Sequence, residues 1–327
     1  MVRFGFPGQA TTILGGMLKH TDRNRISRQA TGVTIGPELA WALLLELRRL
    51  SRARATFPGS LEFGLDARGL PGVIPAGHPA ALLAVTEDGG WLARAPLSAA
   101  GAELFDLYLP MALAGPARPL TVAHLGQSLD GRIATVDGAS CNVNGPENLT
   151  HLHRMRALCD AIVVGAGTVA YDDPQLTTRR VPGPNPVRVV LDPRRRLAAR
   201  HGVFQDGAAP TLLVCAGERD GEPRPGHAQL VGAPCEHQRF NLRAVLARLR
   251  ARSLFGIFVE GGGLTVSAFL EQGLLDRLQI AVAPLIIGSG RPGITLPPIQ
   301  DLDQGLRPRH RRYVMGEDVL FDCRLGG

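Results

Sequence analysis

The spacing of hydrophobic residues divides this sequence into two regions that meet near residue 118. In the first region, residues 36–54 (GPELAWALLLELRRLSRAR) have apolar and polar sides at helical spacing, with arginines late in the segment, where a helix dipole favours cations. Residues 81–95 are typical of two short strands around a glycine-containing turn. Residues 112–119 (ALAGPARP) are typical of a linker. No recognisable chemistry appears here, so residues 1–118 are predicted to form a small α+β region of unknown role.

In the second region, short apolar runs alternate with helical segments. Strands are predicted at 120–126, 160–168, 185–192, 210–215, 254–263 and 276–288, and helices at 145–159, 241–252 and 264–274. Residues 311–325 are typical of a hairpin around Gly316 and Glu317. Short buried strands that alternate with helices indicate an α/β sheet covered on both faces. Because ligands bind beyond the carboxyl ends of strands in such sheets, we expect a site at these ends.

Three predicted strand ends carry residues suited to a site. The run VVGAGT (163–168) leads into VAYDDPQLTTR (169–179), and its glycines would let a ligand approach the backbone closely. The run IFVEGGGLTVSAFL (257–270) places Glu260 at a strand end and three glycines before a helix, where free amides suit a phosphate. The run HLGQSLDGRIATVDGASCNVNG (124–145) combines hydroxyls, a carboxylate and a cation. Each also has a plain structural interpretation: a turn, close packing or a decorated hairpin.

The net charge of +7 comes almost entirely from arginine, since Lys19 is the only lysine among 36 basic residues. The sequence is also rich in alanine, glycine and proline, which is typical of a GC-rich genome. The basic clusters at 192–201 and 307–312 are not interleaved with aromatic residues, as a surface that stacks bases would be. We therefore expect no nucleic-acid partner and favour an anionic small molecule.

The sequence shows no sign of a membrane span, a secretory leader or a metal cage. No apolar run reaches the ~20 residues that a bilayer requires, and the N-terminus lacks a cationic segment followed by an apolar core. The five cysteines are scattered and contain no CxxC pair, which argues against a disulfide framework and a zinc site. The prediction is a cytoplasmic protein without a metal.

In their order and spacing, these segments resemble the reductase domain of riboflavin biosynthesis. The resemblance is carried by SLDGRIAT followed by G-x-S, HRMRALCDAIVVGAGTVAYDDPQLTTR, NPVRVVLDP, FVEGGG and FLEQGLLDRLQIAVAPLIIG, within residues 119–325. In many bacteria that domain is the C-terminal half of a bifunctional deaminase–reductase. The resemblance implies a reductase domain over 119–327 with a dihydrofolate-reductase-like mixed sheet flanked by helices, after the smaller N-terminal α+β region. It also implies a homodimer.

The resemblance further implies an activity and a cofactor. Members of that family use NADPH to reduce the ribosyl chain of 5-amino-6-(5-phosphoribosylamino)uracil, or of its 2,5-diamino relative, to a ribityl chain. Hydride passes to the C1 carbon of the sugar in its imine form. Two alternatives stay open: a same-fold NAD(P)H reductase for another pyrimidine, pterin or imine in secondary metabolism, and a non-catalytic nucleotide-binding module. The joint presence of Asp172, Arg179 and Glu260 argues against the second alternative.

The match of motifs assigns roles to individual residues. It implies that the cofactor is contacted by Gly126, Asn142, Thr168, Asp172, Gly262, Gly263, Leu264, Thr265, Val266, Ser267 and Ala268. It implies that the substrate is contacted by Ser140, Arg156, Leu176, Arg179 and Glu260. Two arginines suit a terminal phosphate, and a glutamate can accept hydrogen bonds from pyrimidine N–H groups. Asp130 and Glu260 are the candidate catalytic residues, with Asp130 either shaping the site or relaying a proton.

The sequence also departs from the family pattern. His124 stands where many members have lysine; it could donate a proton, but a satisfied core residue is the favoured interpretation. Asn142 stands where an aromatic side chain commonly stacks near the cofactor. Residues 1–118 contain no His-x-Glu followed by a Pro-Cys-x-x-Cys pair, so they are not expected to be a zinc deaminase. For NADPH over NADH, the arginines of 192–196 and 179–181 are two candidate contacts to the 2′-phosphate.

Overall fold

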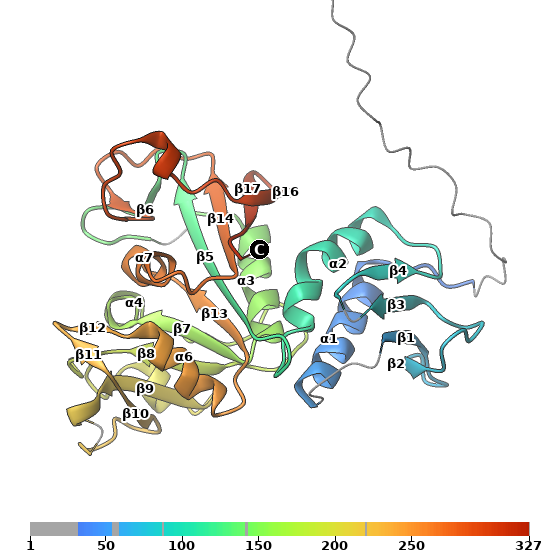
Figure 1. The fold of residues 1–327 in the computed structure, drawn as a ribbon, viewed down its shortest axis with the longest axis horizontal. Helices are drawn as coiled ribbons and strands as arrows, with labels where there is room; N and C mark the ends of the chain where they lie inside the picture. Colours follow the sequence, from blue (N-terminus) through green and yellow to red (C-terminus); the bar gives the residue numbers. More distant parts are fainter. Residues whose placement is uncertain (1–31, 54–58, 87, 141–142, 220, 327) are drawn as a thin grey trace, which may run out of the picture.

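The structure, a computed structural model, describes residues 32–53, 59–86, 88–140, 143–219 and 221–326 (Figure 1). Two main sheets organise these residues: a four-stranded sheet in the N-terminal region and a nine-stranded sheet in the second region. Two short two-stranded sheets complete the arrangement, formed by β6 (Arg132–Ala134) with β15 (Arg291–Pro292) and by β11 (Cys235–Glu236) with β12 (Arg239–Phe240).

The N-terminal region packs two helices beside an antiparallel sheet. Its elements are α1 (Pro37–Ala53), β1 (Ser60–Leu65), β2 (Pro71–Ile74), β3 (Leu83–Thr86), β4 (Trp91–Ala93) and α2 (Ala99–Ala112), with strand order β2-β1-β3-β4. The helix expected over 36–54 and the strand pair expected within 81–95 are confirmed as α1 and as β3 with β4. The amphipathic spacing of α1 buries Leu43, Leu44 and Leu47, which explains why this segment is helical.

The nine-stranded sheet is parallel except at one edge. Its order is β10-β9-β8-β7-β13-β5-β14-β17-β16, in which only β17 and β16 run antiparallel to their neighbours. The strands are β5 (Leu120–Ser128), β7 (Ala161–Gly165), β8 (Val187–Leu191), β9 (Thr211–Ala216), β10 (Gln229–Ala233), β13 (Gly256–Glu260), β14 (Arg277–Ala283), β16 (Arg309–Met315) and β17 (Asp318–Arg324). The central strands read as continuous apolar runs because both of their faces are covered.

Helices cover both faces of this sheet, and two cores result. The helices are α3 (Pro146–Leu158), α4 (Ala166–Asp172), α5 (Gly202–Gln205), α6 (Leu242–Arg250) and α7 (Gly263–Glu271), and there are 3₁₀ turns at Gly217–Arg219 and Leu302–Gln304. Phe258 of β13 belongs to the core that contains α3, whereas its neighbour Val259 belongs to the core that contains α6 and α7. This mixed sheet flanked by helices confirms the expected fold class. None of the helices among the described residues is both long and apolar enough to cross a membrane.

The N-terminal region packs on α3, so the two regions share a core. Phe105 of α2 and Met155 of α3 belong to one buried cluster. Polar contacts join the same surfaces: the Tyr108 hydroxyl lies 2.7 Å from Nδ1 of His151, and Trp41 Nε1 donates to a backbone oxygen in the second region. The predicted linker at 112–119 begins at the last residue of α2 and leads directly into β5.

Some predicted strands are longer than the observed ones. The strand expected over 160–168 ends at Gly165, and Ala166–Asp172 form α4 instead. The strand expected over 276–288 ends at Ala283, and the one expected over 254–263 ends at Glu260. In each case an apolar or glycine-rich run continues past the last paired residue, so hydrophobicity alone does not mark the end.

Candidate active site

The three strand ends singled out in the sequence lie next to each other in the sheet. β13 pairs in parallel with β7 on one side and with β5 on the other, and Glu260 lies opposite His124. The carboxyl ends of β7, β13 and β5 therefore meet at one edge of the sheet. This is the place where the fold class puts a ligand.

The three glycines at 261–263 connect β13 to α7 and pack closely against α4. This segment is called the glycine joint. Gly261 and Gly262 have φ values of 93° and 33°, a region that favours glycine. A Cβ atom on either glycine would lie 3.3 or 3.2 Å from the side chain of Thr168 in α4. A Cβ atom on Gly165 would lie 2.5 Å from Oγ1 of Thr265. The first turns of α4 and α7 therefore approach each other with little side-chain material between them.

The start of α7 is suited to an anion. Gly262 caps this helix without a side-chain hydrogen bond, so no side chain of the cap competes for the first amides. Leu264 is 83% exposed, whereas Val266 and Ser267 are buried, and Ser267 Oγ accepts a hydrogen bond from the backbone N–H of Thr295. Because the side chains of Val266 and Ser267 are buried, a ligand at this segment would contact the backbone of the first helical turn instead.

Glu260 and Arg156 form a bidentate ion pair across the joined elements. Arg156 Nε donates to Oε2 of Glu260 at 2.9 Å, and Arg156 Nη2 donates to Oε1. The side chains are only 9% and 14% exposed. Burial lowers the pKa of Arg156, but the charge and hydrogen bonds of Glu260 outweigh burial and leave that pKa raised. Two residues predicted to bind the substrate thus also hold each other.

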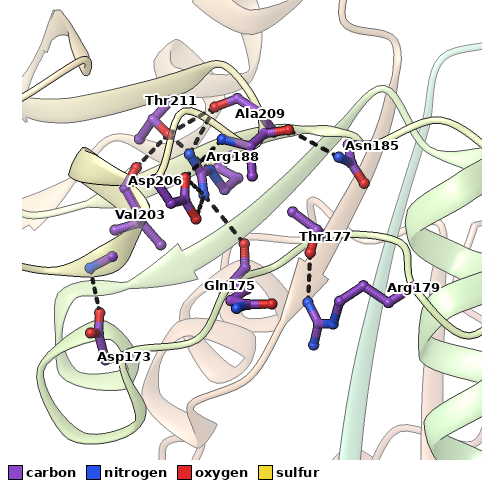
Figure 2. A network of polar contacts seen from close by, with 12 residues as sticks. Asp173, Gln175, Thr177, Arg179, Asn185, Arg188, Val203, Asp206, Ala209 and Thr211 are labelled. Atoms are coloured by element: carbon purple, nitrogen blue, oxygen red, sulfur yellow. Dashed lines mark hydrogen bonds and ion pairs between the residues drawn. The ribbon is translucent and has the colours of Figure 1, made fainter.

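A third predicted substrate residue, Arg179, ends the loop of residues 173–179. Arg156 Nη1 donates to the carbonyl oxygen of Thr177 at 3.1 Å. Arg179 Nη1 donates to Oγ1 of Thr177 at 2.6 Å, and the backbone N–H of Arg179 donates to Nδ1 of His153 at 2.9 Å. Figure 2 shows Arg179 and Thr177 beside the rest of the loop. Arg156 and Arg179 are therefore brought together through one threonine.

Leu176, also predicted to contact the substrate, is buried and has a positive φ. Its side chain is 1% exposed and its φ is 56°, which is uncommon for a leucine. A ligand can therefore reach its backbone rather than its side chain. Strained backbone of this kind clusters at functional sites, where the surrounding structure maintains it.

Arg188 of β8 supplies that surrounding structure and was missed by the sequence analysis. This side chain is 1% exposed and donates to Thr211 Oγ1 at 2.9 Å, to the Ala209 oxygen at 2.8 Å and to the Gln175 oxygen at 3.4 Å (Figure 2). It also pairs with Asp206 at 2.8 Å. The signal available in the sequence was an arginine inside an otherwise apolar strand, which needs buried partners.

Ser140 and Asp172 meet at the surface beside α4. Ser140 Oγ donates to Oδ1 of Asp172 at 3.3 Å, which joins a predicted substrate residue to a predicted cofactor residue. Next to them, the Arg291 guanidinium lies 4.4 Å from the ring centre of Tyr171. Asn142 lies outside the described residues.

Gly126, the remaining predicted cofactor residue, lies beside the side chain of Asn144. A Cβ atom at position 126 would lie 1.8 Å from Oδ1 of Asn144, whose Nδ2 donates to the Ala281 oxygen at 3.2 Å. A larger residue at position 126 would displace this asparagine. The glycine therefore has a clear packing role within the sheet edge.

Asp130 is exposed and holds a neighbouring loop. It accepts hydrogen bonds from Ser128 Oγ at 2.5 Å, from the N–H of Ile287 at 3.1 Å and from the N–H of Gly288 at 2.7 Å. The hydrogen bond from Ser128 and those from the two amides lower the pKa of Asp130 to about 2. A carboxylate this acidic stays ionised near neutral pH, so of its two expected roles the geometry favours shaping the site over proton relay.

His124 has the environment of a core residue, as favoured from the sequence. It is 3% exposed, its Nε2 lies 3.0 Å from Oδ1 of Asn148, and burial lowers its pKa to about 4. Its ring centre lies 5.4 Å from that of His151. Because an amide oxygen only accepts, Nε2 of His124 carries the proton.

Elsewhere, the described residues form a surface cavity but no cluster of metal-ligating side chains. Among these residues, no group of three or more His, Cys, Asp or Glu side chains is arranged to hold a metal ion. A surface cavity lies between α6, α7 and the C-terminal residues and is lined by residues that include Arg243, Arg250 and Asp276. Asp276 precedes β14, so this cavity lies at the opposite edge of the sheet from Glu260.

Comparisons with known proteins agree with this geometry. The family described as RibD C-terminal domain matches residues 119–318. A 2,5-diamino-6-ribosylamino-4(3H)-pyrimidinone 5′-phosphate reductase of Methanothermobacter thermautotrophicus is 36% identical over 220 residues, which are 64% of this chain and 100% of that protein. Riboflavin biosynthesis protein RibD of Aquifex aeolicus is 32% identical over 209 residues, which are 62% of this chain and 57% of that protein. The crystal structure of a deaminase/5-amino-6-(5-phosphoribosylamino)uracil reductase of Thermotoga maritima has a TM-score of 0.56 at 25% identity, covering 70% of this chain and 64% of that one.

Proposed function

Because the chain belongs to the RibD C-terminal domain family, we propose that it reduces the ribosyl chain of a phosphorylated ribosylaminopyrimidine with NADPH, in riboflavin biosynthesis. The substrate is 2,5-diamino-6-ribosylamino-4(3H)-pyrimidinone 5′-phosphate or 5-amino-6-(5-phosphoribosylamino)uracil, which the names of the relatives mention. The observation that carries the proposal is the Arg156–Glu260 pair beside the glycine joint of α7. We take Glu260 as the acceptor for pyrimidine N–H groups and the start of α7 as the segment that would bind the dinucleotide.

The residues present fit a dinucleotide cofactor. The free amides at the start of α7 suit a pyrophosphate, because the capping residue Gly262 has no side chain to compete for them. The cofactor, when bound, supplies the hydride. Thr168, whose side chain lies against Gly261 and Gly262, and Asp172 at the end of α4 border the same proposed site.

For NADPH over NADH, the segment 192–196 is the better supported of the two arginine candidates. β8 ends at Leu191, which lies opposite Gly165, so this segment leaves the sheet at the edge that carries the site. Arg195 is engaged with Glu222 at 2.8 Å, whereas Arg194 and Arg196 are exposed. We assign the contact to the 2′-phosphate to these two exposed guanidiniums, which match a phosphate in charge and geometry.

Three further residues of the site, Arg156, Arg179 and Glu260, bind and orient the substrate. The guanidinium of Arg179, at the exposed end of its loop, suits the sugar phosphate. Glu260 accepts from the pyrimidine, and Arg156 holds its carboxylate in place. Together they place C1 of the sugar near the glycine joint, so that proximity and orientation lower the barrier.

We assign a structural role to the N-terminal region. Several of its contacts with the rest of the chain involve α3 or the residues just after it: Tyr108 bonds His151 in the second turn, and Arg48 and Arg52 pair with Asp160 just after the helix. Arg156 lies between these contacts on the same helix. The region therefore fixes the helix that carries a substrate residue.

We further propose a cytoplasmic homodimer. Val282, Val319 and Val314 lie in register across β14, β17 and β16, and Val314 is 81% exposed at the edge of the sheet. A second copy of the chain that pairs with the edge strand β16 would cover this row of valines. The described cysteines are free thiols, which fits a reducing compartment. Sedimentation of the purified protein tests the homodimer, and a monomer at micromolar concentration would exclude it.

The test of the activity is an assay of NADPH oxidation. Each of the two pyrimidine phosphates is supplied with NADPH or with NADH, and dihydrofolate serves as a non-cognate substrate. We expect oxidation with one of the pyrimidines and slower oxidation with NADH. Tight binding of NADPH without oxidation, or turnover of dihydrofolate alone, would reject the proposed substrate.

A further inference from the structure

His153 of α3 is a buried residue to which the reaction as described gives no part. It is 5% exposed and lies one helical turn before Arg156. Its Nδ1 accepts the backbone N–H of Arg179 at 2.9 Å. It is thus bonded to the residue that we assign to the sugar phosphate, although it is separated from that residue by 26 positions.

The bond requires a neutral imidazole with its proton on Nε2. A charged imidazolium donates from both nitrogens and could not accept from an amide. The surroundings keep the ring neutral: burial lowers the pKa of His153 to about 4, the guanidiniums of Arg156, Arg179 and Arg180 act in the same direction, and Glu260 opposes them. The acceptor is therefore present throughout the neutral pH range.

His153 and Arg156 hold the 173–179 loop at two points that match their spacing on the helix. Residues three apart on a helix lie on the same side. Arg156 bonds the carbonyl oxygen of Thr177, and His153 bonds the N–H of Arg179, two residues farther along the loop. Arg188 bonds the carbonyl oxygen of Gln175 on the sheet side (Figure 2). The backbone is thus held at alternate residues up to Arg179.

We propose that His153 is a positioning residue that fixes the backbone of Arg179, so that its guanidinium meets the phosphate of the substrate. This inference rests on the proposed function. The Arg179 side chain is long and exposed, so its reach depends on where its backbone is fixed. Loss of the bond from His153 would let the end of the loop move and would weaken binding of the phosphate, while the residues around the hydride acceptor stay in place.

The experiment is a double-mutant cycle of His153→Leu and Arg179→Ala, read by KM for the pyrimidine phosphate and by kcat. His153→Leu should raise KM about 10-fold with kcat within about 2-fold, the size expected for the loss of one hydrogen bond. In the Arg179→Ala background, the same substitution should raise KM less than 2-fold, because no guanidinium remains to be misplaced. Equal increases of KM in the two backgrounds would overturn the proposal, as would a fall in kcat without a change in KM.

Two conservative variants separate positioning from simple packing. The amide oxygen of Asn reaches about as far as Nδ1, so His153→Asn should keep KM within about 3-fold of wild type, whereas His153→Gln, whose amide extends towards the Nε2 position, should resemble His153→Leu. Thermal unfolding of each variant controls for folding, and the Asn–Gln pair replaces the Leu variant if that variant does not fold. Equal KM values for Asn and Gln would overturn the positioning role. If wild type reduces neither pyrimidine, the proposed function itself fails; with wild-type turnover, the cycle tests His153 alone.

Discussion

Two arginine–carboxylate pairs lie at opposite ends of strand β13, one in the contact with the N-terminal region and one in the candidate active site. At the amino end, Asp160 pairs with Arg48 at 2.6 Å and with Arg52 at 2.8 Å. At the carboxyl end, Glu260 pairs with Arg156. The chemistry is the same, and the surroundings differ.

The first pair is enclosed by the protein. The second oxygen of Asp160 also accepts the backbone N–H groups of Phe255 and Gly256, at 2.9 and 2.8 Å, and the side chains of Arg48 and Asp160 are 3% and 2% exposed. Glu260 is more exposed, and its oxygens, each bonded to Arg156, retain lone pairs for a ligand. The comparison indicates that one pair stabilises the junction of the two regions, and the other is kept available for binding.

The largest effect on stability should come from Asp160→Asn. We expect the free energy of unfolding to fall by about 3–5 kcal/mol, because the substitution leaves a buried guanidinium without its counter-charge. Urea denaturation measures the loss. The matched control is Arg52→Ala, whose side chain is 42% exposed and whose removal should change stability by at most about 1 kcal/mol. Similar losses from both substitutions would contradict the distinction between the two pairs.

Acid should destabilise the protein through two buried histidines, His124 opposite Glu260 and His151 at the contact with the N-terminal region. Burial lowers the pKa of His124 to about 4 and lowers that of His151 well below its ordinary value. The unfolded chain therefore binds protons from about pH 6.5 downwards while the folded protein does not, so stability is fully present above pH 6.5 and is lost as the pH falls towards 4. The expected slope is about 1.4 kcal/mol per pH unit for each histidine.

Denaturation curves at pH 7.5, 6, 5 and 4.5 measure this loss. His124→Asn is the matched control, because it keeps a polar side chain at the position and removes one titrating group. The plot of the unfolding free energy of His124→Asn against pH should be less steep than that of wild type, by the contribution of one histidine. An equal slope in wild type and variant would show that His124 does not titrate between the folded and unfolded states in this range.

The sequence reveals the large sheet better than the N-terminal region, for a physical reason. Parallel strands covered on both faces become continuous apolar runs, as in β7 and β13, and these were recognised as strands. The hairpin of β1 and β2 was missed because its glycines and prolines resemble those of loops. Helix α4 was missed because its small first residues extend the apolar run of β7.

For the site, motifs indicated residues but not their contacts. Arg156 and Glu260 were both assigned to the substrate, yet their bond spans 104 positions and follows only from α3 lying against β13. His153 could not be singled out from the sequence, because a lone histidine on a helix has no distinctive spacing. Only the folded backbone shows that its acceptor meets the amide of Arg179.

The second pair should respond to substitution through activity more than through stability. Glu260→Gln keeps the size of the side chain and one acceptor for Arg156 but removes the charge that receives the pyrimidine. We expect kcat/KM to fall about 10- to 150-fold, which corresponds to about 1.5–3 kcal/mol for hydrogen bonds to a charged group. The unfolding free energy should fall by less than that of Asp160→Asn. A variant with wild-type kcat/KM would remove Glu260 from the substrate site.

The smallest of these effects should come from removing the Tyr108 hydroxyl, which bonds His151 and so joins the two regions. Gln279 donates from Nε2 to the carboxylate of Asp322, so its oxygen accepts from Nε2 of His151, and Nδ1 of His151 must accept from Tyr108. Tyr108→Phe leaves that nitrogen buried without a donor, which should lower the free energy of unfolding by about 1–2 kcal/mol.

If the N-terminal region serves α3 as a structural partner, kcat/KM of Tyr108→Phe should stay within about 3-fold of wild type, because Arg156 and His153 keep their own bonds to the 173–179 loop. Denaturation and steady-state kinetics on the same preparation measure both quantities, with Glu260→Gln as the reference for a loss of activity. Unchanged stability together with a large fall in kcat/KM would reverse the comparison and make Tyr108 part of the catalytic machinery.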